Sequence, residues 1–308
     1  MASPLIAIVG PTASGKSALA LRLAREHAGE IVSCDSLQVY RGLDIGSAKA
    51  TPAERAEVPH HLLDVVAPSE AFSAADYARL AREALAGIVA RGRLPIVAGG
   101  SGLYVRALLQ GLFEGPSRDD ALRSRLEGLA ERFSDVRLHR LLARVDPPAA
   151  ARTSPNDRVR IVRALEVYWL TGRPISSLQG AGSRPLEGYR TLVLGIAPER
   201  ERLREAVAAR TREMIQRGLV SETEGVLAAS GGVVPRPLEA IGYRQAVAVL
   251  RGDLDLAAAE RSVVTDTMRF AKRQMTWFRH QATVEWFPNA DEAHAAATAW
   301  LRAAPPAP

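Results

Sequence analysis

Short apolar runs alternate with longer helical patterns along the first hundred residues. The strand-like runs are residues 5–9, 30–34 and 94–98, and the helical patterns are residues 16–26 and 74–90. This alternation predicts an α/β fold in which helices cover both faces of a parallel sheet. The segment Gly99-Gly100-Ser101-Gly102 follows the third run directly, at the strand end where open α/β sheets place their ligands.

The pattern changes after residue 116. Helical patterns rich in charge now dominate, and no strand-like run separates them; they are residues 121–132, 137–144 and 156–171. The glycine-containing stretch 180–185 is typical of a linker. We therefore expect a helical insertion domain at residues 117–184.

Beyond the linker the α/β pattern resumes. Strand-like runs recur at 191–196 and 283–287, and a long helical pattern covers 200–216. The expected core therefore comprises residues 1–116 and 185–302. The Pro/Ala-rich tail at 303–308 is expected to be disordered.

The composition favours a polyanionic partner and a reducing compartment. The chain has 308 residues, a formal net charge of +6 and a pI near 9.9, which is a weak indication of nucleic-acid binding. Its single cysteine, Cys34, excludes an intramolecular disulfide. No apolar run approaches ~18 residues and no secretory signal is evident, so we expect a cytoplasmic protein without membrane contact.

Lysine is rare in this chain, and its positions are therefore informative. Thirty-seven of the forty basic residues are arginine, and the lysines are Lys16, Lys49 and Lys272. A chain biased toward arginine retains lysine where a compact ammonium serves better than a planar guanidinium. These three positions are candidates for specific roles.

Lys16 belongs to a phosphate-binding loop. The segment Gly10-Pro11-Thr12-Ala13-Ser14-Gly15-Lys16-Ser17 satisfies the pattern G-x-x-x-x-G-K-[ST] between a predicted strand and a predicted helix. Backbone N–H groups and the helix N-terminus attract anions there. In such loops the lysine reaches the terminal phosphate, and the hydroxyl, here that of Ser17, ligates Mg²⁺. We expect a di- or triphosphate ligand, which need not be ATP.

A second candidate site follows the strand-like run at 30–34. An ATPase would have an acidic residue at the end of a Walker-B strand, whereas the run at 94–98 ends in glycine. The acid at a strand end is Asp35, followed by Ser36, Leu37 and Gln38. Its carboxylate is a candidate general base or a group that orients a metal's ligands, and a helix cap is the alternative.

Further motifs accompany these two along the chain. The full set of motifs, beginning with the phosphate loop, is GPTASGKS at 10–17, DSLQVYR at 35–41, DIGSAK at 44–49, VPHHL at 58–62, GGSGLY at 99–104, RALEV at 163–167, IGYRQ at 241–245 and AKRQMTWFR at 271–279. Together they resemble the bacterial tRNA dimethylallyltransferases, also called tRNA isopentenyltransferases. The resemblance implies a P-loop NTPase-like core with a helical insertion, and Lys49 and Lys272 both lie within shared motifs.

The resemblance also implies a reaction: a dimethylallyl group passes from dimethylallyl diphosphate to N6 of adenosine 37 in tRNA, with Mg²⁺ and release of pyrophosphate. A stacked adenine is out of reach, so the base must be extruded. Asp35 would take the N6 proton, while Ser36 and Gln38 would orient the base or its backbone. The phosphate loop and Lys16 would stabilise the departing pyrophosphate.

Two further residues are implied by the resemblance, each with a plainer alternative. Ser101 would align the donor near the reacting atoms, or it is simply a turn serine. Arg210, within the helical pattern at 200–216, would lie near the diphosphate, or it belongs to a solvated helix face.

Three other segments are implied to contact tRNA: the insertion domain with Arg123 and residues 159–163, the segment 241–244, and the helical pattern at 260–280. If residues 260–280 form one helix, an apolar stripe (Val263, Val264, Phe270, Ala271, Trp277, Phe278) backs a basic side (Arg269, Lys272, Arg273, Thr276, Arg279) suited to RNA phosphates. The implied tRNA-facing positions are Asp35, Ser36, Leu37, Gln38, Ser101, Arg123, Val159, Arg160, Ile161, Val162, Arg163, Ile241, Gly242, Tyr243, Arg244, Lys272, Arg273, Gln274, Thr276, Trp277 and Arg279. Trp277 is more typical of core than of a base-stacking platform. Val159 stands where the family usually has glutamine, which removes one hydrogen bond.

Some interpretations stay open at this point. A P-loop small-molecule or nucleoside kinase would share the phosphate loop, and an RNA-binding protein with a nucleotide-controlled switch is a non-enzymatic alternative. The pair His60-His61 lacks further ligands at metal-binding spacing, so both histidines are expected to be structural or RNA-adjacent. A monomer is the simplest expectation for an enzyme that binds one stem-loop. The tRNAs modified, later steps on the product and the role of Lys49 are not indicated.

Overall fold

The computed structural model describes residues 2–113, 115–179 and 184–303, which form two compact units. The first unit comprises residues 1–109 and 186–308, and the second is the continuous insertion 110–185. The insertion predicted at 117–184 lies inside this second unit. Of the predicted linker and tail, residues 180–183 and 304–308 lie outside the described residues, and Ala303 is the C-cap of the last helix.

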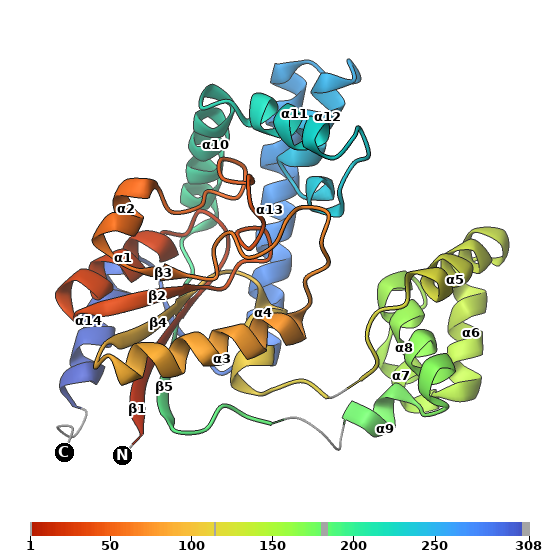
Figure 1. The fold of residues 1–308 in the computed structure, drawn as a ribbon, viewed down its shortest axis with the longest axis horizontal. Helices are drawn as coiled ribbons and strands as arrows, with labels where there is room; N and C mark the ends of the chain where they lie inside the picture. The colour runs from red at the N-terminus through yellow and green to blue at the C-terminus, as the bar shows by residue number, and fades with distance from the viewer. Residues whose placement is uncertain (1, 114, 180–183, 304–308) are drawn as a thin grey trace. The chain divides into compact units, whose positions relative to one another are not determined.

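A six-stranded parallel sheet forms the centre of the first unit (Figure 1). Its strands are β1 (Ser3–Val9), β2 (Gly29–Ser33), β3 (His60–His61), β4 (Leu94–Ala98), β5 (Tyr189–Ile196) and β6 (Glu285–Phe287). They lie in the order β3-β2-β4-β1-β5-β6, and each neighbouring pair is parallel. The predicted α/β fold with a parallel sheet is confirmed, and the carboxyl ends of the strands share one edge.

Helices cover both faces of this sheet. The helices of the first unit are α1 (Lys16–Glu26), α2 (Pro52–Glu57), α3 (Ala74–Ala90), α4 (Gly102–Leu109), α10 (Arg200–Gln216), α11 (Leu219–Ala229), α12 (Tyr243–Leu250), α13 (Leu256–Gln281) and α14 (Ala290–Arg302). Ile6 and Ile8 of β1 point into a core that contains residues of α1 and α14. Leu5 and Ala7 point the other way, toward α3, α4 and α13. Alternate side chains of β1 therefore pack against the helices on the two opposite faces of the sheet.

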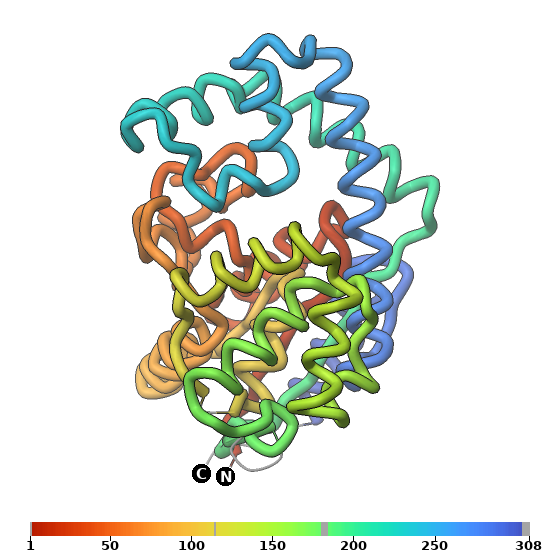
Figure 2. The backbone as a smooth tube through the Cα atoms, turned by 90° about the vertical axis from the view of Figure 1, so that its right-hand side faces the viewer, coloured from red at the N-terminus to blue at the C-terminus, as the bar shows by residue number. Residues whose placement is uncertain are grey.

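A separate apolar core joins the loop after β2 to α11 and α12. Leu43 of this loop packs with Leu219 and Tyr243, and Leu43 and Tyr243 are 0% exposed. The approach is close, since a Cβ atom added at Gly46 would lie 2.5 Å from the Tyr243 ring. The loop is therefore packed against these helices at Leu43 and Gly46. Figures 1 and 2 show that α13 runs beside α10 in the same unit.

The second unit is a bundle of short helices with its own core (Figure 2). They are α5 (Asp120–Phe133), α6 (Asp135–Val145), α7 (Pro147–Arg152), α8 (Arg158–Thr171) and α9 (Ile175–Gln179). Asp146 is fully buried and caps α7 by accepting from the N–H of Ala149 at 3.0 Å, and it also accepts from the N–H of Ser176 at 2.9 Å. This carboxylate ties α7 to α9.

Adding a methyl group at Gly99 should disrupt the first unit. An added Cβ atom would lie 2.0 Å from the carbonyl oxygen of Cys34, and backbone there cannot move without separating β4 from β2. We expect Gly99→Ala to lower the free energy of unfolding by about 2 kcal/mol or more, measured by urea denaturation. Gly225→Ala on α11 is the control, because its added Cβ meets nothing within 4 Å. It should gain about 0.5–1 kcal/mol; equal stabilities of the two variants would contradict the close approach.

Candidate active site

The candidate active site forms where three neighbouring strands end. Strands β2, β4 and β1 are adjacent in the sheet. Asp35 follows β2, Ser101 follows β4, and the phosphate loop at 10–17 follows β1. The parallel order therefore brings three predicted motifs to one edge of the sheet.

Glycine allows the ends of β2 and β4 to approach closely. The N–H of Cys34 donates to the carbonyl of Ala98 at 2.8 Å, and the N–H of Ser101 donates to the carbonyl of Cys34 at 3.2 Å. A side chain at Gly99 would collide with that same carbonyl. Cys34 is fully buried beneath the site, and burial raises the pKa of its thiol to about 12.

The backbone N–H groups of Ser36 and Leu37 hold the side chains of Ser101 and Asp35. The N–H of Ser36 donates to Ser101 Oγ at 3.0 Å, and the N–H of Leu37 donates to Asp35 Oδ1 at 2.8 Å. No described residue makes a hydrogen bond to the second carboxylate oxygen of Asp35. Asp35 is half-buried, so its carboxylate is oriented by the turn while one oxygen stays available.

The phosphate loop depends on two glycines with positive φ. Gly10 has φ 141°, and an added Cβ atom there would lie 2.5 Å from the carbonyl oxygen of Ile196 on β5. Gly15 has φ 91° and directly precedes the first residue of α1. These conformations turn the backbone around the N-terminus of α1, which favours a bound phosphate.

Two cations, buried Lys16 and half-buried Arg210, lie against this loop. Lys16 Nζ donates to the carbonyl of Pro11. Burial and, to a lesser degree, the nearby charge of Arg210 lower the pKa of Lys16 to about 7, against the opposing effect of the Asp35 charge. Arg210 of α10 donates to Thr12 Oγ1 at 3.3 Å, and burial lowers its pKa. Arg210 thus lies at the loop and not on a solvated face, and a bound polyanion would offset the cost of burying both charges.

Gln274 joins the phosphate loop to the end of β4. Its Oε1 accepts from the N–H of Thr12 at 3.1 Å, and its Nε2 donates to the carbonyl of Gly100 at 2.9 Å. Gln274 is buried, so its side chain is not on an RNA-accessible surface. The structure gives this predicted tRNA-facing residue a place inside the protein, as a brace between two loops.

Gln38 also has both ends of its amide engaged. Its Oε1 accepts from Ser33 Oγ at 2.7 Å, and its Nε2 donates to the carbonyls of Ser47 and Ala48 at 3.2 Å each. Gln38 therefore fixes the fold of the loop that follows Asp35. Any effect of Gln38 on the orientation of a bound base would therefore pass through this loop.

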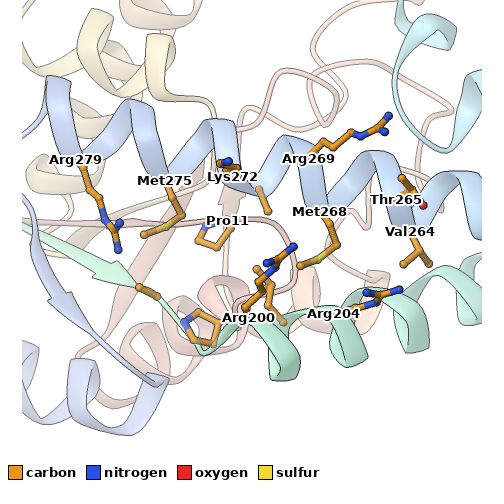
Figure 3. Close-up of a pocket in the computed structure, with 14 residues that line it drawn as sticks. Pro11, Arg200, Arg204, Val264, Thr265, Met268, Arg269, Lys272, Met275 and Arg279 are labelled. Atoms are coloured by element: carbon orange, nitrogen blue, oxygen red, sulfur yellow. The ribbon is translucent and has the colours of Figure 1, made fainter.

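The cations of α13 lie on two sides of the helix, not one. A groove of about 630 Å³ between α10 and α13 (Figure 3) is lined by residues that include Pro11, Arg200, Arg204, Met268, Lys272, Met275 and Arg279. Arg273 lies instead over the ring of Phe270, with its Cζ 5.6 Å from the centroid. Phe270 is 38% exposed, so the predicted apolar stripe is wrong at this position. Trp277 is half-buried and packs against Gly102, while Thr276 is exposed.

In the segment 241–244 only the last residue is exposed. Tyr243 is 0% exposed, Gly242 is buried and Ile241 is half-buried. Arg244 is exposed and pairs with Asp266 of α13 at 2.6 Å. Of the predicted RNA-facing side chains in this segment, Arg244 is therefore the one that reaches the surface fully.

A buried glutamate orders two of the predicted RNA-binding arginines in the second unit. Glu166 is 0% exposed and accepts from both Nε and an NH of Arg123 at 2.8 Å. It also accepts from the guanidinium of Arg163 at 2.6 Å and from the backbone N–H of Asp119 at 2.9 Å. These donors hold the pKa of Glu166 at about 2 against the effect of burial. Arg123 and Arg163 are thus fixed in place on α5 and α8.

The rest of the predicted RNA-binding set on α8 divides by burial. Arg160 and Val159 are exposed, Val159 to 72%, whereas Ile161 and Val162 lie in the core of the bundle. The side chains of Ile161 and Val162 are therefore unavailable to RNA, because the 3.6-residue period turns them inward.

Residues without a predicted role prove to be structural. His61 pairs with buried Glu30 at 2.7 Å, and Arg91 pairs with the same carboxylate at 2.7 Å. Among the described residues no group of three or more His, Cys, Asp or Glu side chains could hold a metal ion. Sequence reasoning missed Glu166, which joins Arg163 of its own helix to Arg123, 43 positions away, and Glu222 of α11, which accepts from backbone N–H groups at 44–46.

Removing the buried charge of Lys16 should stabilise the free protein. The folded-state pKa of about 7 lies below the ordinary value of 10.5, so the unfolded chain binds more protons between these values and the charged form is disfavoured on folding. We expect Lys16→Met to exceed the parent in stability by roughly 2 kcal/mol near pH 6.5. The advantage should shrink as the pH rises toward about 10. Urea denaturation across this range measures it, and a difference that does not vary with pH would contradict burial of the charge as its cause.

Comparison with known proteins agrees with this geometry and confirms the resemblance. The family model described as IPP transferase matches residues 38–281. A tRNA dimethylallyltransferase of Solibacter usitatus is 50% identical over 292 residues, which cover 94% of this chain and 95% of that protein. The crystal structure of the full-length tRNA isopentenylpyrophosphate transferase of Bacillus halodurans is 38% identical with a TM-score of 0.69, covering 97% of this chain and 96% of that one. A eukaryotic dimethylallyltransferase acting on tRNA is 25% identical with a TM-score of 0.78, covering 98% and 80%. This chain belongs to the IPP transferase family, among the tRNA dimethylallyltransferases.

Proposed function

We propose that this protein transfers a dimethylallyl group from dimethylallyl diphosphate to N6 of adenosine 37 in tRNA. The N6 nitrogen attacks the allylic carbon, the bond from that carbon to the diphosphate oxygen breaks, and pyrophosphate leaves with the bonding electrons. The proton of N6 passes to a base on the protein. Family membership supports transfer to tRNA and disfavours the kinase alternative.

The observation that carries the proposal is the meeting of a carboxylate and a phosphate loop at one edge of the sheet, where they follow the two strands, β2 and β1, that flank β4. Asp35 has one carboxylate oxygen held by the turn and the other available, which suits a proton acceptor. Ser101 Oγ is fixed by the N–H of Ser36 and borders the same site. A kinase would use the loop for phosphoryl transfer, whereas here the loop would hold the leaving group.

The negative charge of the departing pyrophosphate would be stabilised by the phosphate loop. Its backbone N–H groups, Lys16 and Arg210 are in place before the substrate binds, so little reorganisation is needed. Ser17 stands exposed at the first turn of α1 and fits a Mg²⁺ ion whose other ligands would be diphosphate oxygens and water. Such an ion would supply further positive charge to the leaving group.

The tRNA would be bound through exposed cations on both units. Arg244, Lys272, Arg273 and Arg279 serve this role in the first unit and Arg160 in the second, where half-buried Arg163 would add a cation held by Glu166. Contacts of this kind act on RNA phosphates and weaken with salt. We expect the protein to act as a monomer. Within the described part of the chain, no helix combines the length and apolarity needed to cross a membrane.

Replacing Asp35 by asparagine tests the proposed base. The amide oxygen can still accept from the N–H of Leu37, so the turn is kept while the basic oxygen is lost. We expect Asp35→Asn to lower the single-turnover rate of transfer by about 10²–10⁴-fold, with pyrophosphate and tRNA affinities nearly unchanged. Asp35→Ala, which also removes the turn, is the comparison. Near-normal turnover of the asparagine variant would remove Asp35 from the base role.

Incubation of the protein with Mg²⁺, unmodified tRNA and labelled dimethylallyl diphosphate tests the reaction itself. Label should enter tRNA, and nucleoside digestion should recover it on one adenosine. Turnover of ATP without label in tRNA would support a kinase instead.

A further inference from the structure

Glu222 of α11 is far from the phosphate loop in sequence and has no role in the mechanism above, yet it accepts four hydrogen bonds. Its Oε2 accepts from the N–H groups of Asp44 and Ile45 at 2.9 and 2.8 Å, and its Oε1 accepts from the N–H of Gly46 at 3.2 Å. The hydroxyl of Tyr243 donates to Oε1 at 2.7 Å. One carboxylate therefore collects three successive backbone N–H groups, and such charge-assisted bonds are stronger than neutral ones.

The segment that Glu222 holds is connected directly to Gln38. The carbonyls of Ser47 and Ala48, next along the chain, accept from Gln38 Nε2. The other end of this amide accepts from Ser33 Oγ at the end of β2. Gln38 and Ser33 thus lie on either side of Asp35, and the position of the Asp35 turn depends on the segment at 44–48.

Lys49 fixes the same segment from its other end. Its side chain is 0% exposed, and its Nζ donates to the carbonyl of Tyr40 at 2.8 Å, to Asp44 Oδ1 at 2.6 Å and to Asp64 Oδ1 at 2.7 Å. Arg55 pairs with the second oxygen of Asp64 at 2.7 Å. With this end anchored inside the first unit, Glu222 supplies hydrogen bonds from the segment to α11, beside the apolar contacts of Leu43 with α11 and α12.

We propose that Glu222 is a positioning residue for the transfer reaction, which holds the backbone at 44–46 and thereby fixes the turn that carries Asp35. Tyr243 orients the Glu222 carboxylate from the other side. The proposal rests on the function proposed above. It differs from a purely structural role because the effect is transmitted to the base and not to the phosphate loop, which belongs to β1 and α1.

The variant Glu222→Gln tests the proposal by turning one acceptor oxygen into an NH₂ group opposite backbone N–H donors. We expect the single-turnover rate of transfer to fall about 10–100-fold, because a displaced base loses alignment. Affinity for pyrophosphate, measured by calorimetry, should be unchanged. Glu222→Asp keeps the charge and should recover part of the rate, and Tyr243→Phe should show a smaller loss.

Thr223→Val is the matched control. Thr223 neighbours Glu222 and is 0% exposed, but its hydroxyl donates to the carbonyl of Leu219 at 2.7 Å within α11. This variant loses a buried hydrogen bond of the same helix without touching the segment at 44–46, and it should retain the transfer rate. Equal rate losses in Glu222→Gln and Thr223→Val would overturn the positioning role.

Amide hydrogen exchange separates this proposal from the proposed function. In the resting protein Glu222→Gln should speed exchange at 36–38 and 44–48, and Thr223→Val should not. Tyr243→Phe serves the same measurement if the first variant fails to fold. Failure of the wild-type protein to modify tRNA would end the proposed function, whereas unchanged exchange at 36–38 would end the assignment of Glu222 in either case.

Discussion

The active-site edge of the sheet depends on one close approach, that of Gly99 to the carbonyl of Cys34. Because no side chain intervenes, the end of β4 can return beside β2, and the N–H of Ser101 can bond to the same carbonyl. That contact fixes the distance between the carboxylate that follows β2 and the serine that follows β4. The phosphate loop joins the arrangement through Gln274, whose buried amide links Thr12 to Gly100. Three chain segments thus share one framework of hydrogen bonds, made by backbone groups and by the side chain of Gln274.

Charge is distributed in this framework for a ligand that carries several negative charges. Lys16 is buried and Arg210 is half-buried against the loop, and the loss of solvent lowers the pKa of each. The arrangement costs stability in the free protein, and that cost is offset when a polyanion binds. In the second unit the balance is different, since Glu166 compensates Arg123 and Arg163 within the protein itself.

The sequence pattern predicted the helices and strands in which buried apolar residues recur at regular spacing. The helices at 74–90 and 200–216 and the strand at 94–98 have the predicted bounds, and the phosphate loop follows from its glycine spacing. The helices α11 and α12 were not singled out, because their apolar residues pack on a loop and not on the sheet. Glu222 could not be predicted, since its partners are backbone N–H groups up to 178 positions away. Phe270 was misjudged because a seven-residue repeat does not say which side of α13 meets the core.

The single thiol of the chain, that of Cys34, lies directly under this edge of the sheet. It is fully buried and its pKa is raised to about 12, so the reactive thiolate is scarce at neutral pH and an alkylating reagent cannot reach it in the closed protein. Any reagent that does modify it must have arrived through a transient opening of the core around it, which includes residues of α3 and α4. The rate at which a thiol reagent modifies Cys34, followed by mass spectrometry, therefore reports how often this part of the core opens. No residue has to be introduced for the measurement.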